Sequence, residues 1–222
     1  MPAPKPPRPY ADAPRLPDAT VGATDPPVAA APPGRVDVRT LVQGAWLELE
    51  IGPGRGGFLF ERAGAVPSAG LIGFEVRRKW ASIVDQRLAK AGLGARARVY
   101  AEDARLALPR LHPDGSLRRV YLHFPDPWWK KRHTKRLVVQ DDVVVEIARL
   151  LETGGELFIQ TDVEDRAVLY ESQVRACPLF APFGDAEGSP MLEKNPYDAE
   201  SPREKRAIAD GLPIHRLRFR RA

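Results

Sequence analysis

The sequence of 222 residues has little of what marks secreted, membrane-spanning or metal-binding proteins. Cys177 is the single cysteine, which excludes an internal disulfide and a cysteine-cluster metal site. The four histidines are scattered, and none has a second ligand at metal-binding spacing. No apolar run approaches the roughly 18 residues of a membrane-spanning helix, and the N-terminus lacks the apolar centre of a signal peptide. We therefore expect a cytoplasmic protein with neither a membrane span nor a metal.

The charge balance is only mildly basic. The chain has 34 Lys and Arg against 29 Asp and Glu, a formal net charge of +5 and a pI of about 9.5. Such an excess permits a polyanionic partner without requiring one. Apolar residues make up 43% of the chain and charged residues 28%, which is ordinary for a globular protein.

Composition divides the chain near residue 38. Eleven of the 23 prolines lie within the first 34 positions, among few large apolar residues. Such a segment buries too little surface to offset the entropy lost in ordering it. We expect residues 1–38 to form a disordered or partly extended tail and residues 39–222 to form a single domain.

From residue 45 onward, short apolar runs alternate with longer amphipathic segments. Strands are predicted at residues 45–52, 70–76, 97–103, 118–124, 156–162 and 212–221, and helices at 52–64, 77–93, 137–155 and 163–177. This order predicts an α/β fold with a doubly wound, mostly parallel sheet and helices on both faces. Ligands of such sheets bind beyond the C-terminal ends of the strands, so the residues that follow each strand are the candidates for chemistry.

The first strand runs into the glycine-rich turn ELEIGPGRGG. Gly52, Gly54 and Gly56 allow a sharp turn and the close approach of a ligand to the main chain. The pattern fits a dinucleotide-binding fold, a methyl-donor fold or a plain strand–helix turn. Glu50 favours the methyl donor, because a carboxylate binds the ammonium group of S-adenosylmethionine, whereas a pyrophosphate gains nothing from it. The alternative is that Glu50 is an acid on an exposed strand end.

Acids also follow the second and third strands. Glu75 lies 23 residues beyond Gly52, where an acid accepts hydrogen bonds from both ribose hydroxyls of an adenosine ligand. Asp103 is placed either to accept a hydrogen bond from the adenine amino group or to cap the following helix. Together with the glycines, these acids predict an adenosine-type ligand.

The fourth strand ends in HFPDPWWKKRHTKR, a lone carboxylate beside a dense basic run. The prolines on either side of Asp126 restrict the backbone and hold this carboxylate in place, as orienting a planar substrate requires. Trp128 and Trp129 offer faces for stacking on a base, or else pack beside the sheet. After the fifth strand, Asp162 is a second carboxylate at the same edge, unless it only caps a helix. Phosphate contacts are expected from Arg77, Arg78, Lys79, Lys130, Lys131, Arg132, Lys135 and Arg136.

Four of these segments, LEIGPGRGGFL, GFEVRRK, YLHFPDPWWKKRHTKRLV and FIQTDVEDRA, together resemble the bacterial tRNA (guanine-N7-)-methyltransferases. The similarity runs from about residue 45 to the C-terminus, and the fourth-strand motif is its most specific part. The resemblance implies a Rossmann-like class I methyltransferase fold and S-adenosylmethionine as the methyl donor. It also implies methyl transfer to N7 of a guanine in the variable loop of tRNA. The proline-rich N-terminal segment has no counterpart in the family pattern.

The resemblance also assigns roles by position. It implies that the methyl donor contacts Glu50, Gly52, Gly54, Gly56, Glu75, Asp103 and Asp126, that Asp126 is catalytic, and that Lys130 and Asp162 contact the substrate. The family's C-terminal substrate motif, Thr-x-aromatic-Glu, is matched by Ser201, Pro202, Arg203 and Glu204. Serine keeps the hydroxyl and Glu204 keeps the acid, but Arg203 replaces the aromatic residue.

Guanine N7 carries a lone pair and no proton, so its methylation needs alignment and electrostatic support, without a general base. Asp126 is therefore expected to orient the guanine and to stabilise the positive charge that develops on it. Three rival functions are an adenine N6-methyltransferase, a nicotinamide oxidoreductase and a non-catalytic RNA-binding module. The first places a similar Asp/Asn-Pro-Pro-aromatic loop after the fourth strand, but here a tryptophan follows the second proline, which favours the guanine family. The second would need a hydride-transfer acid or a tyrosine–lysine pair, and none is evident; the acids Glu50, Glu75, Asp126 and Asp162 argue against the third.

Overall fold

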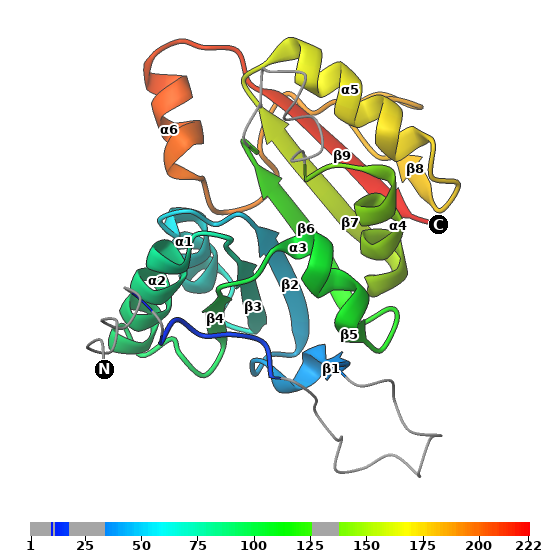
Figure 1. Cartoon of the computed structure of the whole chain (residues 1–222). Helices are drawn as coiled ribbons and strands as arrows, with labels where there is room; N and C mark the ends of the chain where they lie inside the picture. The colour runs from blue at the N-terminus through cyan, green and yellow to red at the C-terminus, as the bar shows by residue number, and fades with distance from the viewer. Residues whose placement is uncertain (1–9, 11, 18–33, 126–137) are drawn as a thin grey trace, which may run out of the picture.

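The computed structural model describes residues 10, 12–17, 34–125 and 138–222 (Figure 1). Within these residues, seven strands form one sheet in the order β4-β3-β2-β6-β7-β9-β8. The strands are β2 (Trp46–Ile51), β3 (Ala69–Phe74), β4 (Ala97–Tyr100), β6 (Leu117–His123), β7 (Leu151–Thr161), β8 (Phe180–Pro182) and β9 (His215–Arg221). The five strands from β4 to β7 pair in parallel, whereas β9 is antiparallel to its neighbours β7 and β8.

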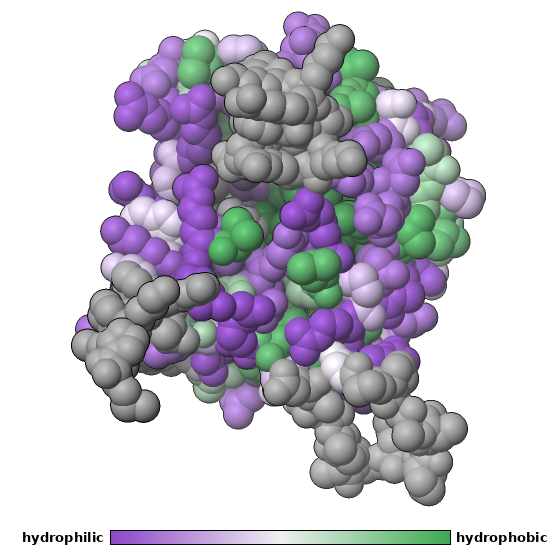
Figure 2. Space-filling model, in the orientation of Figure 1, coloured by the Kyte–Doolittle hydropathy of each residue, from purple (hydrophilic) through white to green (hydrophobic). Residues whose placement is uncertain are grey.

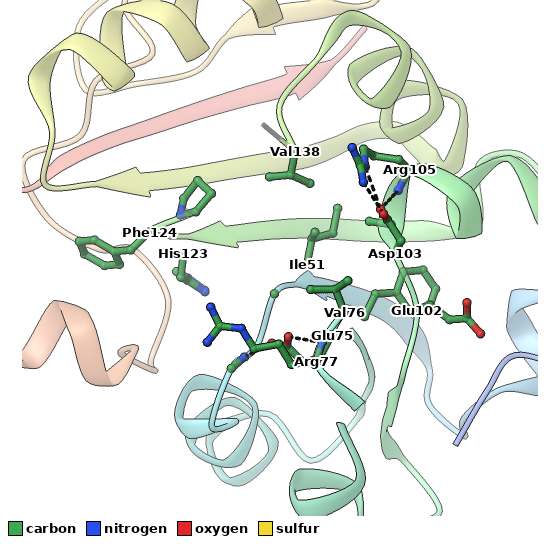
Figure 3. A pocket seen from close by; sticks show the side chains of 15 residues that line it. Ile51, Glu75, Val76, Arg77, Glu102, Asp103, Arg105, His123, Phe124 and Val138 are labelled. Atoms are coloured by element: carbon green, nitrogen blue, oxygen red, sulfur yellow. Dashed lines mark hydrogen bonds and ion pairs between the residues drawn. The ribbon is translucent and has the colours of Figure 1, made fainter. Parts of the chain in front are cut away.

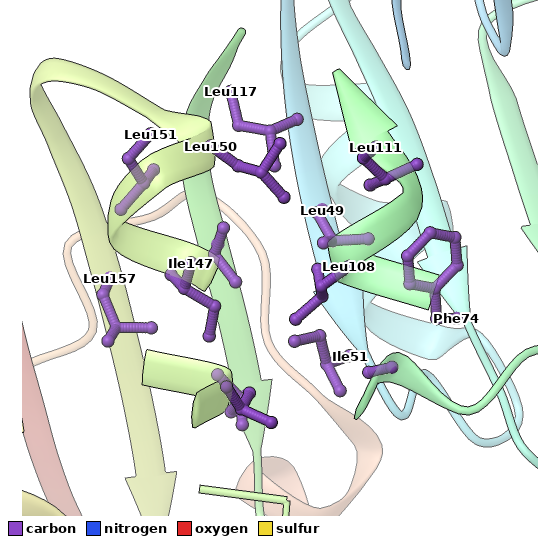
Figure 4. Close-up of a cluster of buried hydrophobic side chains, with 14 of the residues drawn as sticks. Leu49, Ile51, Phe74, Leu108, Leu111, Leu117, Ile147, Leu150, Leu151 and Leu157 are labelled. Carbon is purple, nitrogen blue, oxygen red and sulfur yellow. The ribbon is translucent and has the colours of Figure 1, made fainter. Parts of the chain in front are cut away.

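Helices join the strands and cover both faces of the sheet. They are α1 (Gly57–Ala65), α2 (Arg78–Lys90), α3 (Ala104–Ala107), α4 (Asp141–Leu150), α5 (Glu164–Arg175) and α6 (Pro202–Ala209), with 3-10 turns η1 (Val38–Thr40) and η2 (Leu108–Arg110). One apolar cluster joins α1 and α2 to β3 and β4, and a larger one joins α3, α4 and α5 to the opposite face (Figure 4). The predicted doubly wound, mostly parallel sheet is therefore confirmed. None of the described helices is long and apolar enough to cross a membrane.

Strand β2 shows how the sequence divides between the two faces. Leu47, Leu49 and Ile51 join the larger apolar cluster on the α4 side. Glu48 and Glu50 alternate with them, so their side chains leave the opposite face, the one that α1 covers. Both acids are nonetheless buried, at 1% and 2% exposed. Buried carboxylates require hydrogen-bond or ionic partners, and this requirement shapes the site described below.

The described part of the predicted disordered or partly extended tail over residues 1–38 packs against the domain. Val36 and Asp37 form strand β1 (Val36–Asp37), which pairs in parallel with β5 (Leu111–His112). Val36 and Val38 are fully buried, and Leu16 is 4% exposed. The physical reason is that a few apolar side chains suffice to dock an extended, proline-rich segment on a finished core, although the segment has no core of its own.

The predicted helix over residues 137–155 is shorter in the structure. Helix α4 ends at Leu150, and Leu151 already belongs to β7. Gly154, inside the range predicted as helix, adopts φ 81° within the strand segment. The pairing of β6 with β7 shifts between Leu117 and Arg119, so this irregularity is where the extra residues are accommodated.

Candidate active site

The turn between β2 and α1 depends on glycine. Gly52, Gly54 and Gly56 have φ of 78°, 54° and 77°, in the left-handed region that other residues rarely adopt. A Cβ on Gly56 would lie 2.4 Å from Cγ1 of Val84 on α2, so this position also sets the packing of α1 against α2. A Cβ on Gly52 or Gly54 would meet nothing within 4 Å. The backbone at these two glycines therefore borders open space that a ligand can approach.

That open space is a pocket of about 480 Å³ at the C-terminal ends of β2, β3, β4 and β6 (Figure 3). Of the predicted donor contacts, it is lined by Gly52, Gly54, Glu75 and Asp103. Its remaining charged lining comes from Arg77, Glu102 and Arg105, together with His123 on β6. Four residues that were predicted because they follow strand ends thus line one cavity, although they come from three different strand–helix connections.

Glu75 holds the glycine turn in place. Its Oε2 accepts a hydrogen bond from the backbone N–H of Gly54 at 3.0 Å, and its Oε1 accepts one from the N–H of Arg77 at 2.8 Å. The side chain is thereby fixed between the β2–α1 turn and the start of α2, with the residue 5% exposed. Each carboxylate oxygen keeps acceptor capacity, so a ligand with two hydroxyl donors can still bind it.

Asp103 caps helix α3 and also faces the pocket. It accepts hydrogen bonds from the N–H of Arg105 at 3.1 Å and from Nε of Arg105 at 3.0 Å. The hydrogen bond from the Arg105 side chain holds the pKa of Asp103 below its ordinary value of 3.8. The two interpretations left open for this acid, helix cap and ligand contact, are therefore compatible in one ionised side chain.

Glu50 lies deeper than the pocket wall and is paired with His123. Its Oε1 is 2.9 Å from Nδ1 of His123, and both side chains are 3% exposed. The aromatic rings of Phe58 and Tyr121 pack against this imidazole, with centroids 4.2 and 5.7 Å away, and also against each other at 4.8 Å. Sequence reasoning set the histidines aside, although His123 stands at the end of a strand, where the same reasoning placed Glu75, Asp103 and Asp162.

The predicted C-terminal motif begins helix α6. Ser201 is the N-cap and accepts a hydrogen bond from the N–H of Glu204 at 3.1 Å. Glu204 is fully buried, and its carboxylate accepts hydrogen bonds from Gln160 at 2.7 Å, Arg216 at 3.0 Å and Asn195 at 2.9 Å. Arg203 is paired with Asp162 at the end of β7. The structure therefore brings these four predicted residues together around the start of α6.

These residues lie beside the glycine turn between β2 and α1. A Cβ on Gly57, the first residue of α1, would be 2.4 Å from Cγ of Pro202, the first residue of α6. The starts of α1 and α6 are thus in contact. Asp126 and Lys130 lie outside the described residues, which end on this side at Pro125, a residue of the pocket wall. Among the described side chains, no group of three or more His, Cys, Asp or Glu is arranged to hold a metal ion.

Residues 45–217 match the model of a protein family described as "Putative methyltransferase". A tRNA (guanine-N(7)-)-methyltransferase of Anaeromyxobacter dehalogenans is 43% identical over 180 residues, which span 81% of this chain and 87% of that protein. The chain belongs to this family. A tRNA (guanine-N(7)-)-methyltransferase of Myxococcus xanthus is 38% identical over 78% of this chain and 82% of its own length.

Among solved structures, an S-adenosylmethionine-dependent O-methyltransferase from Thermotoga maritima superposes with a TM-score of 0.52 at 16% identity, over 82% of this chain and 62% of that one. At this identity the likeness concerns the fold alone. The predicted Rossmann-like class I methyltransferase fold is therefore confirmed. The family match ends at residue 217, inside β9, and begins at residue 45, so the packed residues 12–17 and 34–38 lie outside it.

Proposed function

We propose that this protein transfers the methyl group of S-adenosylmethionine to N7 of a guanine in the variable loop of tRNA. The observation that carries the proposal is the 43% identity to a tRNA (guanine-N(7)-)-methyltransferase across most of both chains. The pocket supports it, because its glycine-bordered opening and its strand-end acids suit an adenosine ligand. A cytoplasmic location follows from the proposed substrate.

The donor's adenosine half is assigned to the described pocket. Glu75, already anchored by two backbone N–H groups, accepts hydrogen bonds from the ribose hydroxyls. Asp103 accepts one from the adenine amino group, and its ionised form is favoured by Arg105. Gly52 and Gly54 let the donor lie against the main chain, and Gly56 sets the packing of α1 beneath it. Glu50, on β2 just before the glycine turn, accepts a hydrogen bond from the donor's ammonium group.

The chemical step is a direct displacement. The N7 lone pair forms the new bond to the methyl carbon while the carbon–sulfur bond breaks, and the electron pair of that bond returns to sulfur. The product guanine carries the positive charge that the sulfonium loses, and no proton is transferred at N7. Asp126, carried three residues beyond His123, orients the guanine and stabilises the developing charge, with Lys130 as a substrate contact.

The remaining substrate residues divide into two roles. Ser201 and Glu204 are buried and hydrogen-bonded, so they act by holding the start of α6 in place. Asp162 and Arg203 are the more exposed pair, with side chains 17% and 49% exposed, and they meet the RNA. An arginine in the position of the family's aromatic residue keeps a flat group for stacking and adds a charge for phosphate.

The tRNA backbone is assigned to exposed cations near the pocket. Arg77, Arg78 and Lys79 are exposed at the start of α2, directly after the donor-binding acid Glu75. The face of the molecule seen in Figure 2 is predominantly hydrophilic, with hydrophobic residues in small separate groups. The exposed cations suit a polyanion, whose binding weakens steeply as salt rises.

The deciding experiment is methyl transfer from labelled donor to bulk tRNA that lacks 7-methylguanosine, with the modified nucleoside identified by mass spectrometry. We expect 7-methylguanosine with wild type and a large loss of it with Asp126→Asn. Label in N6-methyladenosine, or no transfer to any tRNA, would overturn the proposal. A nicotinamide-binding assay on the same protein tests the alternative that it is an oxidoreductase, which requires that a nicotinamide cofactor binds.

A further inference from the structure

Three buried polar atoms without a hydrogen-bond partner come from residues on one face of the sheet, at or behind the pocket wall. Within the described residues, these are Oε2 of Glu50 on β2, Nε2 of His123 on β6 and Oε1 of Gln160 on β7. His123 lies directly opposite Gln160 in the β6–β7 ladder, so both side chains leave the same face of the sheet. Glu50 is hydrogen-bonded to His123 on that face. The three residues with unfilled atoms therefore share one face of three adjacent strands.

The chemistry of these atoms defines what fills them. Glu50 is an acceptor when ionised, so the proton of the 2.9 Å contact lies on Nδ1 of His123. In the neutral ring, Nε2 is then an acceptor as well. Gln160 uses its amide nitrogen on Glu204 at 2.7 Å, which leaves its oxygen as the third acceptor. One negative and two neutral acceptors, all buried, are complementary to a primary ammonium, which carries three N–H donors.

Burial makes this interpretation specific. Each unfilled buried polar group costs about 1–3 kcal/mol, so three side by side are expected only where a ligand completes them. His123 itself lines the pocket, and its side chain projects from the end of β6 toward the pocket interior (Figure 3). The methyl donor of the proposed function has one primary ammonium, at its methionine end. Glu50 alone was assigned to that group from the sequence.

We propose that His123 and Gln160 complete the ammonium site of the methyl donor, with His123 also fixing the carboxylate of Glu50. This inference rests on the proposed function for the identity of the ligand. Because each residue contributes one hydrogen bond to a charged group, losing one acceptor weakens the binding of donor or product by about 10-fold to 100-fold. A ligand that lacks the amino-acid end is bound equally well with or without these acceptors.

Calorimetric titration with two ligands tests this. S-adenosylhomocysteine carries the ammonium, and 5′-methylthioadenosine has the same adenosine and thioether but no amino acid. We expect His123→Phe and Gln160→Leu to weaken S-adenosylhomocysteine binding by about tenfold or more while 5′-methylthioadenosine stays within about twofold of wild type. His123→Asn is the matched variant: its amide replaces Nδ1 toward Glu50 but has no group at Nε2, so it shows the same selective loss.

An equal loss for both ligands would mean that the residues only support the pocket, and no loss for either would mean that they do not bind the donor; both outcomes overturn the inference. His123→Asn, which keeps a polar partner for Glu50, provides the folded variant if His123→Phe does not fold. These titrations contain no tRNA. If wild type fails to bind S-adenosylhomocysteine, the proposed function itself falls, whereas normal wild-type binding with unchanged variants refutes only this inference.

A second inference comes from the N-terminal residues 12–17, which lie outside the family match. Arg15 donates to the carboxylate of Glu102 through Nε at 2.8 Å and Nη2 at 3.1 Å, and the N–H of Leu16 donates to the same carboxylate at 3.1 Å. The N–H of Ala101 donates to the carbonyl of Pro14 at 2.6 Å. Glu102 lines the pocket beside Asp103, so this segment holds in place the part of the pocket wall to which the adenosine is assigned.

We infer that residues 12–17 act as a strap that positions the β4–α3 turn for adenosine binding. The side chain of Arg15 is half exposed. Arg15→Ala therefore removes the two hydrogen bonds from the guanidinium to Glu102 and leaves the buried Leu16 in place. We expect it to weaken 5′-methylthioadenosine and S-adenosylhomocysteine by the same factor, about threefold to tenfold for bonds in a partly exposed pair. Arg15→Lys, which keeps the charge, recovers part of the loss. Unchanged affinity for 5′-methylthioadenosine in Arg15→Ala would refute the strap, and a loss confined to S-adenosylhomocysteine would refute its place at the adenosine end.

Discussion

Glu48 is the residue whose replacement tests the buried polar face of β2 most directly. Its carboxylate accepts two hydrogen bonds from Arg62, both at 2.8 Å, one from Arg119 at 3.0 Å and one from the hydroxyl of Tyr121 at 2.9 Å. Glu48 is 1% exposed and Arg62 4%. Glu48→Leu therefore leaves the guanidinium of Arg62 buried without its counter-charge. Removing one partner of a buried pair costs about 3–5 kcal/mol.

For a chain of this length, each kcal/mol corresponds to roughly 2–4 °C in Tm, so we expect a fall of about 6–20 °C. Urea unfolding followed by tryptophan fluorescence measures the free energy of unfolding, and Trp46, whose Nε1 donates to Glu48 at 3.1 Å, reports on the site itself. The matched control is the double variant Glu48→Leu with Arg62→Leu, which removes both charges and is expected to recover most of the loss.

The loss also depends on pH in a defined direction. Burial by itself would raise the pKa of Glu48, but the hydrogen bond and charge of Arg62, with help from Trp46 and Arg119, outweigh it and lower the pKa below 4.5. A carboxyl group whose pKa is lowered in the folded state stabilises the protein above its unfolded pKa, and that stabilisation is lost as the pH falls. The difference between wild type and Glu48→Leu therefore shrinks below pH 4.5. Two outcomes would refute the conclusion that Arg62 requires Glu48 as its buried partner. One is a loss of less than about 1 kcal/mol in the free energy of unfolding of Glu48→Leu at pH 7, and the other is a double variant as unstable as Glu48→Leu.

Three further predictions concern the donor turn and its neighbours. Gly56→Ala is expected to lower the free energy of unfolding by at least about 2 kcal/mol, because Gly56 has φ 77° and its new Cβ would clash with Val84. The control Gly64→Ala, within α1, is expected to raise the free energy of unfolding by about 0.5–1 kcal/mol. Equal effects of the two variants in urea unfolding would contradict this. Arg105→Ala is expected to raise the pKa of Asp103 toward 3.8, measured by carboxyl NMR titration, so that stability above that pH falls; an unmoved titration would show that Arg105 does not set it. Ser201→Ala is expected to cost about 1 kcal/mol as a lost N-cap and Ser201→Thr much less; identical stabilities would exclude the cap.

Strands that carry an apolar pattern over six residues could be predicted from sequence to within a few residues, as β2 and β3 show. Strands β1, β5 and β8 have two or three residues each, which is too short for any periodicity, and they exist only because a partner strand is present. Helix α6 did have a local signal. Ser201, followed by Pro202 and by Glu204 three residues later, is an N-terminal capping pattern, but those residues were interpreted only as a substrate motif.

The candidate site was predictable where it follows single strand ends, and not where it depends on pairs distant in sequence. Gly52, Gly54, Glu75 and Asp103 line the pocket as the strand-end rule predicts. Glu50 and His123 are 73 residues apart, and nothing near either one indicates the other. The contact of Arg15 with Glu102 spans 87 residues and starts in a segment whose composition predicted no structure. Such contacts follow from strand order, which the local pattern does not determine.

Strand order also explains why donor and acceptor chemistry meet at one place. From β2 the chain adds β3 and β4 on one side and then crosses to add β6 on the other, so the order in which strands are added reverses between the parallel strands β2 and β6. The pocket opens above this reversal and draws its walls from both halves. His123 sits on β6 beside Glu50, and the proposed catalytic Asp126 follows three residues later in the chain. Because side chains alternate along a strand, shifting β6 by one residue against β2 would turn His123 to the opposite face. The register that pairs Glu50 with Tyr121 therefore fixes the proposed ammonium site and the start of the segment that leads to the proposed catalytic residue together.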